Sequence, residues 1–297
     1  MSAISKLTVI GVGLIGGSFA LALKAAGAVQ HVVGVGRSAE NLQLALSRGV
    51  IDAIETDVAQ AVQGAQLVFV ATPVGSMHAV FQSIAPHLSA EALITDGGST
   101  KQSVIAAARA ALGKRVGRFI PSHPIAGSDR SGAQAASSEL YRGREVILCP
   151  LEENRSADVV LVRTLWQQCG ARVSEMAADQ HDAVLSAISH LPHFISYAYV
   201  NAIAAHQEAP ELLRHAGGGF RDFTRLAGSH PQMWADICLA NRDALLAELS
   251  RFDRANAALR ALLEAGDVAG LEKHFAAARS LRERWAKSSG QEISEGE

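Results

Sequence analysis

Two side chains suited to proton transfer and hydrogen bonding follow short apolar runs in the first half of the sequence. His123 stands in Ser-His-Pro-Ile-Ala-Gly, and Ser99 stands in Asp-Gly-Gly-Ser-Thr-Lys. A histidine has an unperturbed pKa near working pH, so it can take a hydroxyl proton while hydride leaves the same carbon. Ser99 can hydrogen-bond that hydroxyl. Position alone also allows a structural or cofactor-contacting role for His123, and Ser99 can instead be, or also be, the N-cap of the next helix.

The second half of the chain contains further histidines and a pair of oppositely charged residues. His190 and His193 are three residues apart and can share a helix face, as two metal ligands would, but no third ligand is spaced to join them. We therefore expect no metal site. Arg225 follows Asp222 by one helical turn. On a surface this is an ordinary ion pair, whereas in a cleft Arg225 can bind a carboxylate with two parallel hydrogen bonds.

A glycine pattern near the N-terminus predicts a dinucleotide site. Gly11-x-Gly13-x-x-Gly16 directly follows the strand-like run Leu7–Ile10 and opens a helix-forming stretch. Such glycines permit a tight turn, a close approach of the backbone to the pyrophosphate and close helix–strand packing. The phosphates then face the N–H groups at the start of the helix. The alternative is a tight turn that binds no ligand.

The residues after the second predicted strand bear on the choice of cofactor. An acidic residue that holds the ribose of NAD is usual about 20 residues past the glycine turn, but here the position is Gly36. Arg37 and Ser38 follow it and can bind a 2′-phosphate through charge-assisted hydrogen bonds. We therefore favour NADP over NAD. The alternative is that Arg37 stacks on adenine, which either cofactor allows.

The elements that must position these residues alternate between strand and helix in the first half. This pattern predicts an α/β fold with a Rossmann-like, doubly wound parallel sheet. The expected strands are 7–10, 31–35, 67–71, 93–96, 118–122 and 145–149. Ligands of such sheets bind outside the carboxyl ends of the strands. The turns expected to line that crevice are Gly11–Gly13, Thr72-Pro73, Asp96–Ser99 and Ser122–Pro124.

Beyond a polar stretch at 150–157 the sequence is mostly helical. We expect a dinucleotide-binding domain over 1–155, an all-helical domain over 156–286 and a flexible tail over 287–297. A long apolar helix over 179–205 contains Pro192, which should kink it, and a second helical stretch covers 231–265. Such Ala/Leu-rich helices need a partner surface, so we expect a homodimer through the helical domain.

Composition excludes several classes of protein. The 297 residues are 48% hydrophobic and 19% charged, with 27 Lys and Arg against 29 Asp and Glu. A net charge of −2 disfavours both disorder and nucleic-acid binding. The three cysteines are far apart, and the N-terminus lacks a secretory pattern. We therefore expect a cytoplasmic protein with reduced thiols and no membrane segment.

Five motifs follow one another along the chain. They are Gly11-x-Gly13-Leu14-Ile15-Gly16-Gly17-Ser18, Asp96-x-Gly98-Ser99-x-Lys101, His123-Pro124-Ile125-Ala126-Gly127, Ser189-His190-Leu191-Pro192-His193 and Phe220-x-Asp222-Phe223-Thr224-Arg225-x-Ala227. In this order they resemble one enzyme family, the prephenate/arogenate dehydrogenases of tyrosine biosynthesis. The resemblance covers about residues 7 to 285.

The resemblance implies a role for each matched residue. His123 matches the catalytic histidine that takes the proton of the ring hydroxyl, and Ser99 matches the serine that hydrogen-bonds it. Arg225 matches the arginine that binds a substrate carboxylate. The other substrate-binding matches are His193, Asp222, Ser128 and His181. From the turns and the motifs together, the residues expected to bind the cofactor are Gly11, Gly13, Leu14, Ile15, Gly16, Arg37, Ser38, Thr72 and Pro73.

The implied reaction is the oxidative decarboxylation of prephenate, arogenate or both, with hydride transfer to a nicotinamide cofactor. The sequence departs from the family pattern at Gly36-Arg37 and at His230, where many relatives have Asp. We expect no regulatory amino-acid-binding domain, so any inhibition by tyrosine would act at the active site. Two alternatives remain: another two-domain NADP oxidoreductase, such as a β-hydroxyacid dehydrogenase or an imine reductase, and a non-enzymatic dinucleotide-binding redox sensor. The former usually relies on a lysine in the helical domain, where Lys273 and Lys287 are poorly placed.

Overall fold

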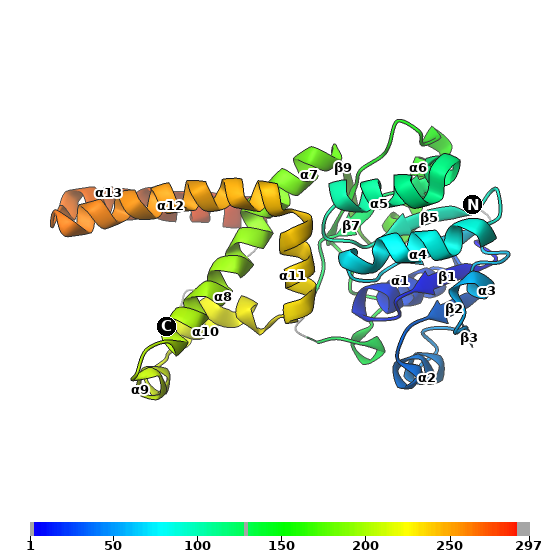
Figure 1. Cartoon of the computed structure of the whole chain (residues 1–297), viewed down its shortest axis with the longest axis horizontal. Helices are drawn as coiled ribbons and strands as arrows, with labels where there is room; N and C mark the ends of the chain where they lie inside the picture. The colour runs from blue at the N-terminus through cyan, green and yellow to red at the C-terminus, as the bar shows by residue number, and fades with distance from the viewer. Residues whose placement is uncertain (1–2, 128–129, 290–297) are drawn as a thin grey trace. The chain divides into compact units, whose positions relative to one another are not determined.

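The computed structural model of the protein describes residues 3–127 and 130–289. The chain divides into two compact units, Met1–Leu245 and Leu246–Glu297. The order of the elements can be followed in Figure 1. The first unit contains both sheets and all the predicted site residues that the structure describes.

A six-stranded parallel sheet forms the centre of the first unit. Its strands lie in the order β3-β2-β1-β4-β5-β6, and the register places Leu7 opposite both Val32 and Leu67. This arrangement confirms the predicted doubly wound α/β fold. The strands are β1 (Leu7–Ile10), β2 (Val32–Val35), β3 (Ala53–Ile54), β4 (Leu67–Val70), β5 (Leu93–Asp96) and β6 (Phe119–Ile120).

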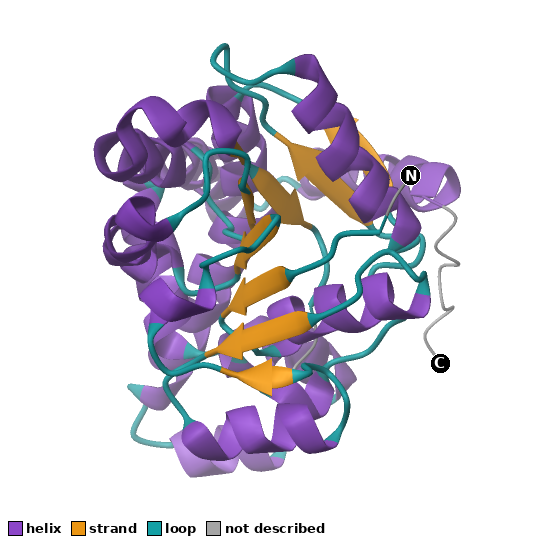
Figure 2. Ribbon diagram, turned by 90° about the vertical axis from the view of Figure 1, so that its right-hand side faces the viewer, coloured by secondary structure: helices purple, strands orange, loops and turns teal. Residues whose placement is uncertain are grey.

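Helices cover both faces of this sheet, as Figure 2 shows. Alternate residues of β4 point to opposite faces: Phe69 packs with Phe19 and Trp166, whereas Val68 belongs to the cluster of Phe81. Because both faces are buried, the strands consist of continuous apolar runs. One face carries α1 (Leu14–Ala25), α2 (Ala39–Ser47) and α6 (Ser156–Gln168), and the other carries α3 (Val58–Ala61), α4 (Met77–Ile84) and α5 (Gln102–Leu112).

A second, three-stranded sheet corrects the prediction of one parallel sheet. The strand expected over 118–122 divides at Pro121, which has no N–H to donate, and the chain continues into β7 (Ser122–Pro124). β7 pairs antiparallel with β8 (Glu145–Leu148), and β8 pairs parallel with β9 (Arg172–Glu175). His123 therefore lies within a strand, opposite Ile147, and not in a turn after one.

α6 and β9 follow the domain boundary expected between residues 155 and 156, but they pack with elements that precede it. Trp166 of α6 contacts Phe19 of α1 with ring centroids 4.5 Å apart, and β9 extends the second sheet. Both elements therefore pack with the N-terminal sheets, although the expectation assigned them to the helical domain.

The helical part of the first unit begins with one continuous helical path. It consists of α7 (Ala178–Leu185), the π-helical turn η5 (Ser186–His190) and α8 (Leu191–Ala204). Pro192 lies in the first turn of α8, and the widened turn before it is where a kink was expected. The elements that follow are α9 (Ala209–Arg214), α10 (Gly218–Thr224), η6 (Arg225–Gly228), α11 (Pro231–Ala240) and α12 (Arg242–Glu264).

The second unit contains the rest of α12 and α13 (Val268–Ser289). Gly266 makes the connection with a φ of 63°, a value that favours glycine. The predicted tail begins at 287, but α13 continues through Ser289, and 290–297 lie outside the described residues. No helix in the described parts of the chain is long and apolar enough to cross a membrane. The remaining 3-10 turns are η1 (Val74–Ser76), η2 (Ala85–His87), η3 (Gly113–Arg118) and η4 (Ala133–Ala135).

Candidate active site

The glycine turn between β1 and α1 has the shape that a pyrophosphate site requires. Gly11 has a φ of 99°, and a Cβ there would lie 2.5 Å from the carbonyl oxygen of Ala71. A Cβ on Gly16 would lie 2.1 Å from the carbonyl oxygen of Gly11. Gly13, the N-cap of α1, has no atom within 4 Å of a built Cβ. Gly11 and Gly16 therefore allow close packing, whereas Gly13 leaves open space beside the backbone.

The surroundings of this turn fit a dinucleotide. The first turn of α1, which includes Leu14 and Ile15, carries no acidic residue that would repel phosphate. After β4, the buried hydroxyl of Thr72 has no hydrogen-bond partner among the described residues, and Pro73 follows it. A buried hydroxyl without a partner is costly unless a ligand or water satisfies it. The open cradle at Gly13 and the hydroxyl of Thr72 are thus suited to hold a nicotinamide dinucleotide.

Arg37 and Ser38 lie between β2 and α2, and both are exposed. The hydroxyl of Ser38 accepts a hydrogen bond from the N–H of Asn41 at 3.1 Å and so caps α2. The Ser38 hydroxyl can still donate its own proton, because a serine both accepts and donates. Gly36 has a φ outside the left-handed region, so a side chain is sterically possible there.

A histidine cluster, comprising His123, His181, Asp182 and His190, lies where β7 meets α7 and η5. Nδ1 of His123 lies 2.8 Å from Nε2 of His181, and Nδ1 of His181 lies 2.8 Å from Oδ1 of Asp182. His123 is 9% exposed, and the other three side chains are completely buried or nearly so. Asp182, His181 and His123 form a hydrogen-bonded line that ends at His123.

Burial and neighbouring charges keep these histidines neutral. Desolvation, together with His181 and Lys101, holds the pKa of His123 well below its ordinary value. Desolvation likewise lowers the pKa of His181 and brings that of His190 to about 4. For Asp182, burial raises the pKa, but hydrogen bonds from His181 and from two backbone N–H groups outweigh it and lower the pKa overall. At neutral pH, Asp182 is a carboxylate and His123 is an unprotonated base.

The loop that carries Ser99 is tied to β7 by a buried ion pair. Lys101 is fully buried, and its ammonium donates to Asp96 and to the carbonyl oxygen of Ser122. Asp96 in turn accepts from the N–H groups of Ser122 at 3.0 Å and Gly98 at 2.8 Å. Lys101, not Ser99, is the N-cap residue of α5. The half-buried Ser99 is therefore held beside the strand of His123 without serving as a helix cap.

His190 adds a further contact between the helical region and this loop. Its Nδ1 accepts from the side-chain amide of Asn241 at 3.0 Å, and the same amide donates to the backbone oxygen of Asp182 at 2.8 Å. The backbone of Ser99 also interacts with the His190 ring. His190 is thus held through Nδ1 by Asn241, and it is near Ser99 and His123.

Arg225 begins η6, which packs against α8. We call Asp222, Arg225 and His193 the arginine segment. The charge of Arg225 is close enough to add to the desolvation that lowers the pKa of His193. The His193 ring stacks on Trp234 at 3.6 Å between centroids, and Trp234 also contacts His190. A row of rings therefore extends from His190 through Trp234 to His193, whose pKa the charge of Arg225 affects.

The exposure of the arginine segment differs from that of the histidine cluster. Asp222 and Arg225 are exposed, and Asp222 lies 3.6 Å from Arg221. His193 donates from Nδ1 to the carbonyl oxygen of Ser189 at 2.9 Å, which leaves its Nε2 as an acceptor. Ser128, the remaining predicted substrate contact, lies outside the described residues.

His230, a departure from the family pattern, has a local structural role. It is the N-cap residue of α11, where its Nδ1 accepts from the N–H of Met233 at 3.5 Å. An aspartate is a common N-cap residue, so the histidine replaces it in kind.

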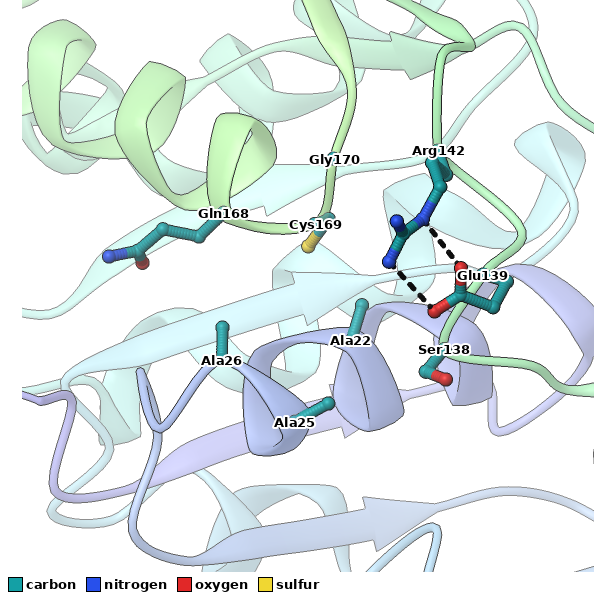
Figure 3. Close-up of a pocket in the computed structure, with 9 residues that line it drawn as sticks. All are labelled: Ala22, Ala25, Ala26, Ser138, Glu139, Arg142, Gln168, Cys169 and Gly170. Atoms are coloured by element: carbon teal, nitrogen blue, oxygen red, sulfur yellow. Dashed lines mark hydrogen bonds and ion pairs between the residues drawn. The ribbon is translucent and has the colours of Figure 1, made fainter.

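A concavity elsewhere on the first unit holds none of the predicted residues. It lies between the end of α1, the loop at 138–142 and the end of α6, as Figure 3 shows. Glu139 and Arg142 form an ion pair there, and burial raises the pKa of the Cys169 thiol. A protonated thiol is a poor nucleophile, so these residues offer no chemistry for the reaction.

Several residues of this site were not assigned a role from the sequence. Asp182 is the neighbour of His181 in the sequence, and Asp96 and Lys101 belong to the same motif as Ser99, but residue spacing does not indicate their contacts. Asn241 and Trp234 gave no signal beyond helical periodicity. Among the described residues, no group of three or more His, Cys, Asp or Glu side chains is arranged to hold a metal ion.

Comparison with known proteins gives a consistent family. The model described as "Prephenate dehydrogenase, nucleotide-binding domain" matches residues 19–175, and "Prephenate dehydrogenase, dimerization domain" matches 177–277. A cyclohexadienyl dehydrogenase of Zymomonas mobilis is 34% identical, over 95% of this chain and 96% of its own. A prephenate dehydrogenase of Bacillus subtilis is 37% identical, over 92% of this chain and 74% of its own.

Solved structures agree with this match. The prephenate dehydrogenase of Aquifex aeolicus, in complex with hydroxyphenyl propionate and NAD+, has a TM-score of 0.89 and 31% identity, over 95% of this chain and 99% of that one. The arogenate dehydrogenase of Synechocystis has a TM-score of 0.79 and 26% identity, over 94% of this chain and 99% of that one.

Proposed function

The chain belongs to the prephenate dehydrogenase family, and from this premise we propose that it oxidises and decarboxylates prephenate, arogenate or both in tyrosine biosynthesis. Both substrates carry a ring hydroxyl and a ring carboxylate, and they differ in a side-chain keto or amino group. A nicotinamide dinucleotide, when bound at the glycine turn, accepts hydride from the hydroxyl-bearing carbon. The ring then loses its carboxylate as carbon dioxide and becomes aromatic, which makes the step strongly downhill.

His123 is the general base in this reaction. Its unprotonated imidazole takes the proton of the ring hydroxyl, and Ser99 hydrogen-bonds the same oxygen. The observation that supports this assignment is the buried line from Asp182 through His181 to His123, beside the loop that carries Ser99. A base with a lowered pKa is unprotonated at neutral pH and ready to act.

Arg225 binds a substrate carboxylate. A guanidinium and a carboxylate can form two parallel charge-assisted hydrogen bonds. His193 supplies a neighbouring acceptor at Nε2, Asp222 belongs to the same polar segment, and Ser128 is a further substrate contact. We place His181 in the pocket as the partner of His123 and not as a substrate ligand.

NADP is the preferred cofactor in this proposal. The exposed guanidinium of Arg37 and hydroxyl of Ser38 can meet a 2′-phosphate, and Gly36 offers no carboxylate to repel it. Gly11, Gly13 and Gly16, with Leu14 and Ile15, would hold the pyrophosphate, and Thr72 and Pro73 would contact the same cofactor. Comparison of kcat/KM for NADP and NAD tests this preference, and a strong preference for NAD would contradict it.

The protein acts as a homodimer through its helical region. Large apolar side chains are exposed on the second unit, among them Leu263, Val268, Phe275 and Leu281, each at least 56% exposed. Exposed apolar faces of this kind mark interaction surfaces. Light scattering should give the mass of two chains, and a monomer at micromolar concentration would contradict the proposal. We place the protein in the cytoplasm, because all three cysteines are free thiols.

One assay tests the function directly. The purified protein is mixed with NADP or NAD and, in parallel, with prephenate or arogenate, while the absorbance of the reduced cofactor is followed. Reduction that needs one of these substrates supports the proposal. Reduction only with β-hydroxy acids, or no reduction at all, would favour another oxidoreductase or a redox sensor.

A further inference from the structure

One buried carboxylate contacts both the loop that carries Ser99 and the histidine that contacts His123. Asp182 lies in α7 and is 1% exposed. Its Oδ1 accepts from the N–H of Lys101 at 2.7 Å and lies 2.8 Å from Nδ1 of His181. Its Oδ2 accepts from the N–H of Gln102 at 2.9 Å. Three donors therefore surround this carboxylate, and two of them come from a segment about 80 residues earlier in the chain.

The two backbone contacts complete the N-terminus of α5. The first N–H groups of a helix have no partner within the helix, and an anion there is favoured by the helix dipole. Lys101, the N-cap residue, contributes no side-chain cap of its own. Asp182 therefore caps α5 from α7, and this fixes the end of the segment that begins at Ser99.

The contact with His181 determines where the protons of the histidines lie. A carboxylate only accepts hydrogen bonds, so His181 must donate from Nδ1 and is left with an acceptor at Nε2. His123 must then donate from Nδ1 to this acceptor. The free lone pair of His123 consequently lies on Nε2, which faces away from the line of hydrogen bonds.

The backbone of Asp182 is itself held in place. The side-chain amide of Asn241 donates to its carbonyl oxygen at 2.8 Å and to Nδ1 of His190 at 3.0 Å. The carboxylate thus has a fixed position relative to both the α5 terminus and the His181 ring.

We propose that Asp182 is a positioning residue that sets the tautomer of His123 through His181 and the placement of Ser99 through α5. The proposal rests on the proposed function, because it assigns the proton acceptor to Nε2 of His123. Asp182 does not touch the substrate. Its carboxylate determines both the tautomer of His123 and the position of Ser99, the two residues that contact the substrate hydroxyl.

An amide cannot replace this carboxylate. In Asp182→Asn, one orientation turns NH2 toward the N–H of Gln102, and the other turns it toward the N–H of Lys101 and toward His181. The second orientation makes Nδ1 of His181 an acceptor and reverses both tautomers. In serine proteases, the same change of the triad aspartate leaves the catalytic histidine in the wrong tautomer and lowers kcat by about 10⁴-fold.

The test combines NMR spectroscopy with kinetics. Long-range ¹H–¹⁵N spectra of the full-length protein with ¹⁵N-labelled histidine, in which His123→Asn identifies the His123 signals, report which ring nitrogen carries the proton. We expect only Nδ1–H in the wild type, whereas Asp182→Asn, through the second amide orientation, should add a population with Nε2–H. Its kcat should be about 100-fold lower, with KM changed far less. An Asp182→Asn protein that keeps only Nδ1–H and a wild-type kcat would overturn the proposal. The matched control is Asp179→Asn, an exposed aspartate of the same helix, which should change neither.

A second pair of variants serves if Asp182→Asn does not fold. His181→Gln keeps an acceptor for His123, whereas His181→Leu removes it. We expect the Gln variant to keep the Nδ1–H tautomer and a kcat at least about tenfold above that of the Leu variant. Equal kcat values, or a wild-type His123 protonated on Nε2, would overturn the proposal. A wild type with the expected tautomer but no prephenate or arogenate turnover would instead contradict the proposed function.

Discussion

The histidine cluster and the arginine segment contribute to the same proposed reaction, but the chain builds them differently. His123, His181, Asp182 and His190 are buried and connected by hydrogen bonds to backbone and side chains. Asp222 and Arg225 lie on short, exposed elements. The proposed base is thus held by buried hydrogen bonds before substrate binds, whereas the proposed carboxylate-binding group lies at the exposed surface of the chain. The groups proposed for the chemical step are therefore preorganised, and the groups proposed for substrate binding are exposed.

The largest effect is expected from loss of the base. His123→Asn removes the proton acceptor, and kcat should fall at least about 100-fold at saturating substrate. Steady-state kinetics measure this, and the exposed His87→Asn is the matched control. Near-normal turnover of His123→Asn would remove the histidine cluster from the mechanism.

A change in the arginine segment should act on binding. Arg225→Gln removes a charge-assisted contact of about 1.5–3 kcal/mol, which corresponds to an increase of roughly 10- to 150-fold in KM for the cyclohexadienyl substrate. We expect kcat to change only a few-fold. Arg221→Gln, one helical turn earlier and also exposed, should leave KM unchanged. If kcat collapsed and KM stayed the same, the division of roles between the two regions would be wrong.

The cofactor site offers a smaller test of the same principle, because Arg37 is also exposed. Gly36→Asp should place a carboxylate where it repels a 2′-phosphate, and Arg37→Gln should remove the cation that attracts it. Each change should lower the ratio of kcat/KM for NADP to that for NAD by about tenfold. A ratio that did not respond to either change would indicate that Arg37 does not read the 2′-phosphate.

The smallest expected effect is a pH dependence of folding stability, and it arises only from the buried histidines. A histidine whose pKa is lowered by folding binds its proton more weakly in the folded than in the unfolded state, so stability is lost as pH falls below the unfolded pKa of about 6.5. For His190, with a pKa of about 4, the loss between about pH 6.5 and 5.5 is of order 1 kcal/mol.

Denaturant unfolding at the two pH values measures this loss. His190→Asn keeps an acceptor for the amide of Asn241 and removes the titrating ring, so its free energy of unfolding should depend less on pH than that of the wild type. Equal pH dependence in the two proteins would show that folding does not lower the pKa of His190. The activity should likewise decline only on the acid side of about pH 6.5, because His123 is protonated only there.

The sequence predicted the elements whose signals are local. Apolar runs predicted β1 and β5 with the observed bounds, and the glycine spacing predicted the turn at Gly11 because its geometry depends on neighbouring residues. The two-residue β3 and the strand β9, which contains Arg172 and Glu175, have no such apolar run and were not predicted.

The contacts within the histidine cluster could not be predicted in the same way. Asp182 caps a helix that lies 80 residues earlier, and His123 meets His181 across 58 residues of chain. Such pairs depend on how β7 and α7 pack, and no residue spacing contains that information. Pro121 illustrates the same limit. A proline predicts that the strand is interrupted, but the residues after it join a second sheet because they pair with β8, which is distant in the sequence.

The most direct test is a crystal structure of the protein with NADP and the aromatic product bound. The account predicts that the product's ring hydroxyl lies within hydrogen-bonding distance of Nε2 of His123 and of the Ser99 hydroxyl, while its side-chain carboxylate contacts Arg225. A product bound with its hydroxyl away from His123, or with Arg225 outside the same pocket, would contradict it.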